Sequence, residues 1–389
     1  MSHGTYKNIN NLYKDSFKAI FNLIKDNYPF KNRKDFILFK NNFKKHFLKL
    51  NSIKTDEDFY IFAKFFVASL GDTHTKIAGY PWKFYKPDKY RVIIENKKFF
   101  LLKANKLIGE IFSVDGKKPA MILKKSIELI SGKSKQYLID QGLPFVLADT
   151  MDKPAVVEIV SAKSKKIIIL NRQLINNPIK PFTESNFLEK DIFYIKISFW
   201  SQSIKDDIER EINKILQNNI KLLIVDVRGN SGGDSRIADL FAGHFFKENA
   251  LFRYYKVRKN KSNFLLSQKQ FFIKALAPYI NIPIMILTDR ACFSSNELFI
   301  AGMKDNKRAL IIGEKTAGGT GNPKTFEIVS GKYVLKLAVS SWIVKRLNGK
   351  LIEGAGIEPD IAVGLKISDI ENNRDVVLER ALLEAKKIV

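Results

Sequence analysis

"NIPIMILTDRACFSSNELFIAGMKD", residues 281–305, follows the same plan as "KLLIVDVRGNSGGDSRIADLFAGHFF", residues 221–246. Each stretch begins with a continuous apolar run typical of a buried strand, crosses a short turn, and ends with apolar residues at helical spacing. Strands that alternate with helices in this way form crossover units, whose strands lie parallel in one sheet. The two stretches therefore predict an α/β fold with a mostly parallel sheet.

The patterns on either side of these stretches divide the chain into three expected parts. Residues 1–80 carry three segments with helical spacing, which predict an N-terminal helical domain ending in the loop around His74. Residues 81–175 contain mainly short strand patterns, and we expect a small β-rich middle module there. Residues 176–389 form the expected α/β core. Its approach, residues 174–190, is polar with two prolines and predicts a linker.

The composition is that of a globular chain with a strong positive charge. Hydrophobic residues make up 45% of the 389 residues, and the formal net charge is +26. The lysines are scattered along the whole chain, so we expect no nucleic-acid partner. No apolar run is long enough for a membrane helix. The N-terminus lacks the apolar region and cleavage site of a signal peptide, so we expect a protein that stays inside the cell or whose export signal has been trimmed.

Cysteine and histidine are too scarce for a disulfide framework or an obvious metal site, and we expect neither metal nor cofactor. The single cysteine, Cys292, is expected to be a small buried residue at a strand end. Among the four histidines, His74 is set apart by its loop, "GDTHT", in which hydroxyls and a carboxylate flank the imidazole. Such a loop can hold the ring in one orientation, although a solvated loop histidine is the ordinary alternative.

Ser294 and Ser295 lie between a predicted strand and a predicted helix. Serine is a preferred N-cap residue, and Glu297 stands three positions after Ser294, as a capping box requires. A helix N-terminus also offers free backbone N–H groups that suit an oxyanion. This stretch alone leaves two interpretations open, an ordinary cap and a nucleophile held on a turn.

Two further stretches bear on that choice. The loop "RGNSGG", residues 228–233, lacks the spacing of a phosphate-binding loop. Its glycines suit either a tight turn or backbone N–H groups presented to a carbonyl oxygen. Glu353, in "IEGAGIEPDI", stands before a Gly-x-Gly turn, where a solvated turn residue is the ordinary expectation.

Four stretches taken together resemble the C-terminal-processing (tail-specific) serine peptidases, a family that includes the tricorn protease core. In family order they are "SLGDTHT", "LLIVDVRGNSGG", "ILTDRACFSSNELFIAGMKDNKRALIIGEKTAGG" and "IEGAGIEPDI". The resemblance covers about residues 69–361. It implies a ClpP/crotonase-like catalytic core and a serine peptidase that hydrolyses peptide bonds in peptide or protein substrates. The middle module resembles part of a PDZ domain without its Gly-Leu-Gly-Phe-type loop, which implies a degenerate module.

The resemblance also implies roles for single residues. Ser294 matches the family's nucleophile. The backbone N–H groups of Gly232 and Ser295 match the two donors of an oxyanion hole. The processing branch of the family has a lysine base where this chain has Gly319. The nearest lysine, Lys315, stands four residues too early.

The tricorn-like branch instead takes its base from an earlier loop, and His74 matches that histidine. Glu353 matches the distal glutamate that orients it. Thr73 stands where tricorn-like sites place a hydroxyl that relays between the two. A solvated imidazole titrates near pH 6.5, so the sequence predicts activity that rises with pH through about that value.

Other functions stay open at this point. A non-catalytic ligand-binding protein on the same fold is one, and a crotonase-like acyl-CoA enzyme is another. A third is a processing protease with a displaced Ser–Lys pair that uses Lys315.

Overall fold

The computed structural model describes residues 3–31, 33–161, 164–175, 180–258 and 266–388. Its centre is a six-stranded sheet with the order β19-β15-β14-β11-β10-β9. The strands are β9 (Thr183–Glu189), β10 (Ile192–Ile197), β11 (Leu222–Asp226), β14 (Ile284–Thr288), β15 (Leu310–Gly313) and β19 (Ile361–Ala362). All neighbours pair in parallel except β9, which runs antiparallel to β10. The predicted α/β class and mostly parallel sheet are confirmed.

Helices cover both faces of this sheet, because successive strand residues point to opposite sides. Leu223 and Val225 pack in one core cluster with the three helices that follow β10, β11 and β14. Leu222 and Ile224 pack in another cluster with α10, near the end of the chain. The helices are α6 (Lys205–Gln217), α7 (Ser235–Gly243), α8 (Ser295–Asp305) and α10 (Val376–Ala385), with the short 3₁₀ helix η3 (Gln202–Ile204). A further short helix, α9 (Ile367–Glu371), precedes α10 and bonds instead to the middle of the chain, where Glu95 accepts the Ile367 N–H. A burial of this kind on both faces explains the continuous apolar runs in the sequence.

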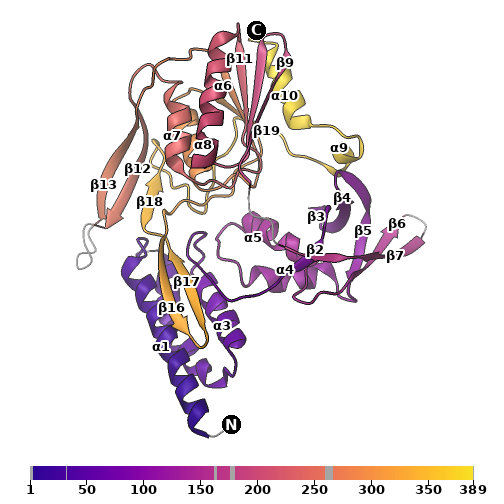
Figure 1. Cartoon of the computed structure of the whole chain (residues 1–389), viewed down its shortest axis with the longest axis vertical. Coiled ribbons are helices and arrows are strands. Elements are labelled where there is room, and N and C mark those ends of the chain that lie inside the picture. The colour runs from indigo at the N-terminus through magenta and orange to yellow at the C-terminus, as the bar shows by residue number, and fades with distance from the viewer. Residues whose placement is uncertain (1–2, 32, 162–163, 176–179, 259–265, 389) are drawn as a thin grey trace.

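The N-terminal helices are confirmed, but they pack against a hairpin that comes from late in the chain. They are α1 (His3–Asn27), α2 (Lys34–Lys49) and α3 (Asp56–Ala68), with η1 (Leu50–Ser52). The hairpin, β16 (Lys324–Ser330) and β17 (Tyr333–Val339), lies across them and pairs with β1 (Lys76–Ala78) (Figure 1). Helices and hairpin share one core cluster rich in phenylalanine.

The middle of the chain forms a five-stranded antiparallel sheet with its own core. Its strands are β3 (Tyr90–Glu95), β4 (Lys98–Lys103), β5 (Lys106–Val114), β6 (Ala155–Ser161) and β7 (Ser164–Leu170), next to the pair β2 (Tyr85–Pro87) and β8 (Arg172–Leu174). The helices α4 (Pro119–Ile127), α5 (Lys135–Gly142) and η2 (Leu143–Val146) connect β5 to β6. A further sheet, β13-β12-β18, comprises β12 (Ala250–Arg258), β13 (Leu266–Ile273) and β18 (Trp342–Lys345).

One local prediction is corrected. The expected linker at residues 174–190 contains the edge strand β9, all of whose side chains are exposed or half-buried; residues 176–179 lie outside the described part. Later in the chain, Ser340 and Ser341 separate β17 from β18 and belong to neither sheet. In the described ranges, no helix is long and apolar enough to cross a bilayer.

Candidate active site

Ser294 stands at the sharp turn between β14 and α8, in a backbone conformation that non-glycine residues rarely adopt. Its φ is 58° and its ψ is −126°. Its N–H donates to Gly319 O at 3.0 Å and to the Glu297 carboxylate at 3.3 Å. Its hydroxyl lies 3.0 Å from His74 Nε2. The turn therefore directs the side chain toward the histidine, and a strained conformation of this kind is typical of functional sites.

His74 is held in place by the loop that follows α3. Asp72 organises this loop: one carboxylate oxygen accepts the N–H groups of His74 at 3.2 Å and Thr75 at 2.8 Å. The same oxygen accepts the Ser340 hydroxyl at 2.6 Å, and Ser340 N–H donates to Thr75 Oγ1 at 3.1 Å. The break between β17 and β18 thus occurs where the chain binds the histidine loop.

Glu353 reaches the histidine through Thr73 and has no direct bond to it. The Thr73 hydroxyl lies 3.0 and 3.1 Å from the two Glu353 oxygens and 3.4 Å from His74 Nδ1. The backbone N–H groups of Thr73 and Thr320 also donate to the carboxylate, at 3.2 and 2.8 Å. A hydroxyl has one proton to donate, so donation to Glu353 leaves its oxygen to accept from Nδ1–H. The other ring nitrogen, Nε2, can then accept the Ser294 proton.

Burial sets the charge state of this chain of groups. Burial lowers the pKa of His74 from 6.5 to about 4, against the opposing attraction of the Asp72 carboxylate. Burial also raises the pKa of Glu353 well above its usual value, and Asp72 adds to that rise. The imidazole is therefore neutral at neutral pH, as a proton acceptor must be. The predicted titration near 6.5 assumed a solvated ring and does not fit this burial.

Glu297 is more than the capping residue that the sequence indicated. It is fully buried in α8, and its carboxylate accepts the N–H groups of Gly318 and Gly319 at 2.8 and 2.7 Å and the Thr316 hydroxyl at 2.5 Å. Burial raises its pKa to about 7, although these hydrogen bonds oppose the rise. The residue ties the loop after β15 to the start of α8. Its role was missed because the capping box explained the motif locally.

The "RGNSGG" loop lies against the serine turn. A side chain at Gly232 would place its Cβ 2.7 Å from Ser294 Cβ and 2.8 Å from Phe293 O, and φ there is 104°. The Gly232 N–H donates to Asn230 Oδ1 at 2.8 Å. Ser295 is the first residue of α8, so its N–H has no partner within the helix. Of the two expected oxyanion donors, Gly232 is thus already engaged and Ser295 stands at a helix start.

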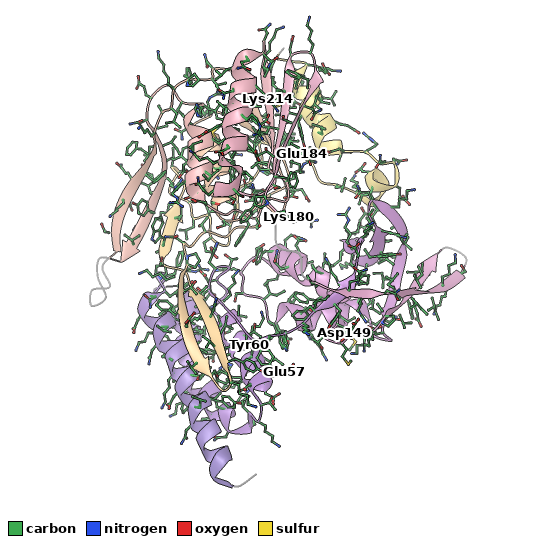
Figure 2. All side chains as sticks on the ribbon, in the orientation of Figure 1. Glu57, Tyr60, Asp149, Lys180, Glu184 and Lys214 are labelled. Carbon is green, nitrogen blue, oxygen red and sulfur yellow. The ribbon has the colours of Figure 1, made fainter. Side chains whose placement is uncertain are left out.

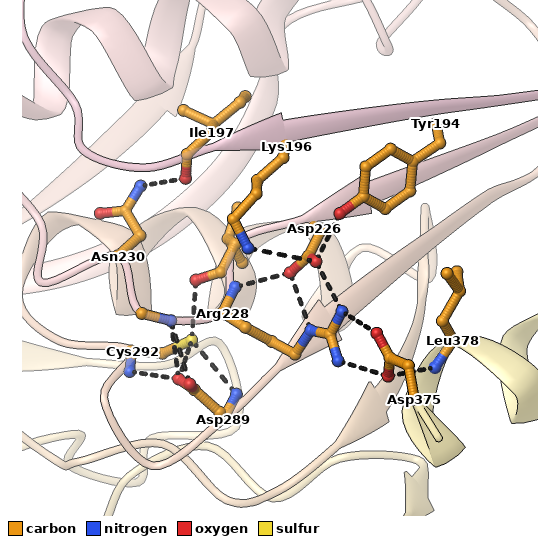
Figure 3. A network of polar contacts seen from close by, with 12 residues as sticks. Tyr194, Lys196, Ile197, Asp226, Arg228, Asn230, Asp289, Cys292, Asp375 and Leu378 are labelled. Carbon is orange, nitrogen blue, oxygen red and sulfur yellow. Dashed lines mark hydrogen bonds and ion pairs between the residues drawn. The ribbon is translucent and has the colours of Figure 1, made fainter. Parts of the chain in front are cut away.

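A network of charged side chains fixes the start of this loop (Figure 3). Arg228 bonds both Asp226, at the end of β11, and Asp375, just before α10. Cys292 is completely buried, and its thiol donates to Val227 O at 3.1 Å. Burial raises the pKa of that thiol well above its usual value, which leaves it unreactive. The structural interpretation of Cys292 is confirmed.

Lys315 lies in different surroundings from His74. Its ammonium pairs with Glu358 at 2.6 Å, and half of its side chain is exposed. Gly319, where the processing branch has its lysine, has no room for one: a Cβ would lie 1.8 Å from the Phe293 ring and 2.6 Å from Thr73 Oγ1.

A stack of aromatic rings beside Ser294 was not predicted from the sequence. The Phe293 ring lies parallel to the His74 ring, with centroids 4.7 Å apart, and Tyr137 of α5 also stacks on the Phe293 ring, with centroids 5.6 Å apart. The middle module therefore touches the turn that holds Ser294. No local pattern links a tyrosine at 137 with a histidine at 74, so only the tertiary structure reveals it. Within the described residues, no group of His, Cys, Asp or Glu could hold a metal ion.

Part of the chain matches a protein-family profile. Residues 191–363 match the sequence profile of "Peptidase family S41". The chain is similar to the carboxy-terminal processing protease CtpB of Bacillus subtilis, 25% identical over 44% of this chain and 33% of CtpB. It is also similar to the chloroplastic carboxyl-terminal-processing peptidase 2 of Arabidopsis thaliana, 22% identical over 80% of this chain and 62% of that protein. The chain thus spans less than two thirds of the length of these curated relatives.

A solved structure shares the fold over nearly the whole chain. The structure of mature CPAF complexed with lactacystin superposes with a TM-score of 0.78 and 14% identity, over 97% of this chain and 98% of that one. At this identity the likeness concerns the fold alone.

Proposed function

We propose that the protein is a serine peptidase that hydrolyses peptide bonds through an acyl-enzyme, and the match of residues 191–363 to peptidase family S41 supports this. The observation that carries the proposal is the 3.0 Å contact between Ser294 Oγ and His74 Nε2. A serine hydroxyl is a weak nucleophile and needs such a base to take its proton.

The proposed mechanism assigns one task to each group. His74 accepts the Ser294 proton as Oγ attacks the scissile carbonyl, and then donates it to the leaving amine. Water repeats the sequence on the acyl-enzyme. Thr73 and Glu353 orient the ring and stabilise the imidazolium, the role that an aspartate fills in other triads. A positive charge on His74 also favours the ionised form of Glu353. The Asp72 carboxylate likewise favours the positive charge on the His74 ring.

We assign the oxyanion hole to the backbone N–H groups of Gly232 and Ser295. Both belong to segments in contact with the Ser294 turn. The bond from Gly232 N–H to Asn230 Oδ1 means that the developing oxyanion must replace or share the Asn230 acceptor. Preorganised donors of this kind stabilise the charge that appears only in the transition state.

The finer features of the fold belong to the same proposal. The core at 176–389 is of the ClpP/crotonase-like type, and the middle module at 81–175 is a degenerate PDZ-like module. The N-terminal helical domain at 1–80 supplies the base. His74, Thr73 and Glu353 favour the tricorn-like branch of the family. The partners are peptide or protein substrates.

Hydrolysis of an unfolded protein substrate tests the proposal. The wild-type chain should cleave it, and Ser294→Ala should not, because the nucleophile is lost. The Ser295→Ala variant is the matched control, because it keeps the backbone N–H. If Ser294→Ala cleaves as fast as wild type, the assignment is wrong.

A further inference from the structure

A large cavity lies between the N-terminal helices and the middle module, apart from the catalytic residues. Its volume is about 620 Å³, within the range of ligand sites. Its lining includes five aromatic side chains: Tyr60 of α3, Phe145 of η2, and Tyr80, Trp82 and Phe84 of the segment after β1. Figure 2 labels Tyr60 on the helical side and Asp149 on the opposite side.

Two further hollows share lining residues with this cavity. One, toward the start of α3, shares Lys125 and Leu129 with it. The other shares Trp82, Phe84 and Phe145 with it. We call the cavity and these two hollows together the aromatic groove.

Three lysines on separate elements line the central cavity: Lys64 of α3, Lys117 before α4, and Lys125 of α4. None of them forms an ion pair within the described part of the chain. Burial lowers the pKa of Lys64, so its ammonium is poorly solvated. Asp149 also lines the cavity, but it already pairs with Lys153 and Arg172.

The groove lies close to the candidate active site along the chain. Ala78, at the end of β1, lines the cavity and follows His74 by four residues. Four extended residues span no more than about 14 Å. A polypeptide bound in the groove could therefore present a bond a few residues away to Ser294.

The wall formed by residues 79–84 offers side chains, because these residues form no strand with which a ligand could pair. The edge strand β1 reaches the cavity with its last residue, Ala78. Recognition falls to the rings, which take an apolar side chain, and to three dispersed ammonium groups. Cations on three separate elements suit several carboxylates along a segment better than one terminal carboxylate.

We propose that the aromatic groove is an exosite for an internal acidic–apolar segment of a substrate, with an aromatic or aliphatic side chain in the cavity and Asp or Glu carboxylates on Lys64, Lys117 and Lys125. This inference rests on the proposed function only in treating the ligand as a substrate. The binding itself requires no turnover.

Binding of fluorescent peptides to the full-length Ser294→Ala protein tests the exosite. A peptide with Phe and Leu flanked by Asp and Glu should bind, and the same peptide with Lys in place of the acids should not. Lys64→Gln with Lys125→Gln should weaken binding about fivefold or more. Lys124→Gln is the matched control, because Lys124 lies on the same helix but outside the cavity. Amidation of the peptide C-terminus should change nothing.

Three results would overturn the exosite. The first is equal affinity for the acidic and the basic peptide. The second is an affinity that the lysine substitutions do not change. The third is loss of binding when the peptide C-terminus is amidated, which would indicate that the groove binds a C-terminus instead. Binding without hydrolysis by the wild-type chain would leave the exosite in place and remove the proposed function. Hydrolysis of a short neutral peptide, unaffected by the lysine variants, would support the function independently.

Discussion

His74 and Lys315 are the two candidate bases in the sequence, and their surroundings differ in every respect that matters to catalysis. His74 is 7% exposed and lies within hydrogen-bonding distance of Ser294. Lys315 is half exposed and paired with Glu358. Lys315 is nearer to the nucleophile in sequence, yet the distant histidine reaches it. The contrast indicates that burial and contact identify the base better than sequence distance.

The largest effect on kcat should come from replacing each of the two candidate bases by alanine in turn. His74→Ala should lower kcat about 10³-fold or more, because His74 is the base that contacts the Ser294 hydroxyl in the described part of the chain. Lys315→Ala should change kcat little, since it removes only a surface ion pair. Steady-state hydrolysis of one peptide by both variants gives the comparison, with circular dichroism as the check on folding. An inactive Lys315→Ala together with an active His74→Ala would reverse the assignment.

A second variant tests how much the loop beside Ser294 contributes to kcat, compared with the base. Gly232→Val should lower kcat about 100-fold, the usual cost of losing one oxyanion donor. The added Cβ would meet Ser294 and Phe293, and valine does not favour a φ of 104°. KM for the same peptide is measured alongside, and thermal unfolding reports on the fold. Near-normal turnover would move the donor elsewhere, with Gly233 the next candidate.

The smallest change concerns the relay behind the histidine. Thr73→Val removes the hydroxyl between His74 and Glu353 at nearly constant volume, and should lower kcat about tenfold. Thr73→Ser is the matched control and should retain activity, because it keeps the hydroxyl. If Val and Ser at this position behave alike, Thr73 only packs, and Glu353 acts on the histidine by charge alone.

The sequence predicted those parts of the molecule that local patterns encode. The alternation of apolar runs and helical spacing gave the parallel sheet, and the motifs located Ser294, His74 and Glu353. The structure brings these three together through Thr73, over separations of up to 280 residues. Their catalytic roles stay a prediction.

Contacts between distant segments could not be predicted in this way. The packing of β16 and β17 on the N-terminal helices follows from burial of phenylalanine-rich faces, which has no local signal. The stack of Tyr137 on Phe293 depends on how the middle module docks. The pKa of His74 likewise depends on its burial in the folded chain, so a value from a solvated ring could not hold.

The most direct test of the account is the site and pH dependence of labelling by a fluorophosphonate, with the modified residue mapped by mass spectrometry. We expect the label on Ser294, because its hydroxyl lies within hydrogen-bonding distance of the His74 ring. Since burial places the pKa of His74 at about 4, labelling should stay fast well below the value of about 6.5 for a solvated imidazole and fall toward pH 4. A label on Ser295 or Cys292, no label on the folded protein, or a rate that rises only at the alkaline pH of a lysine base would contradict the account.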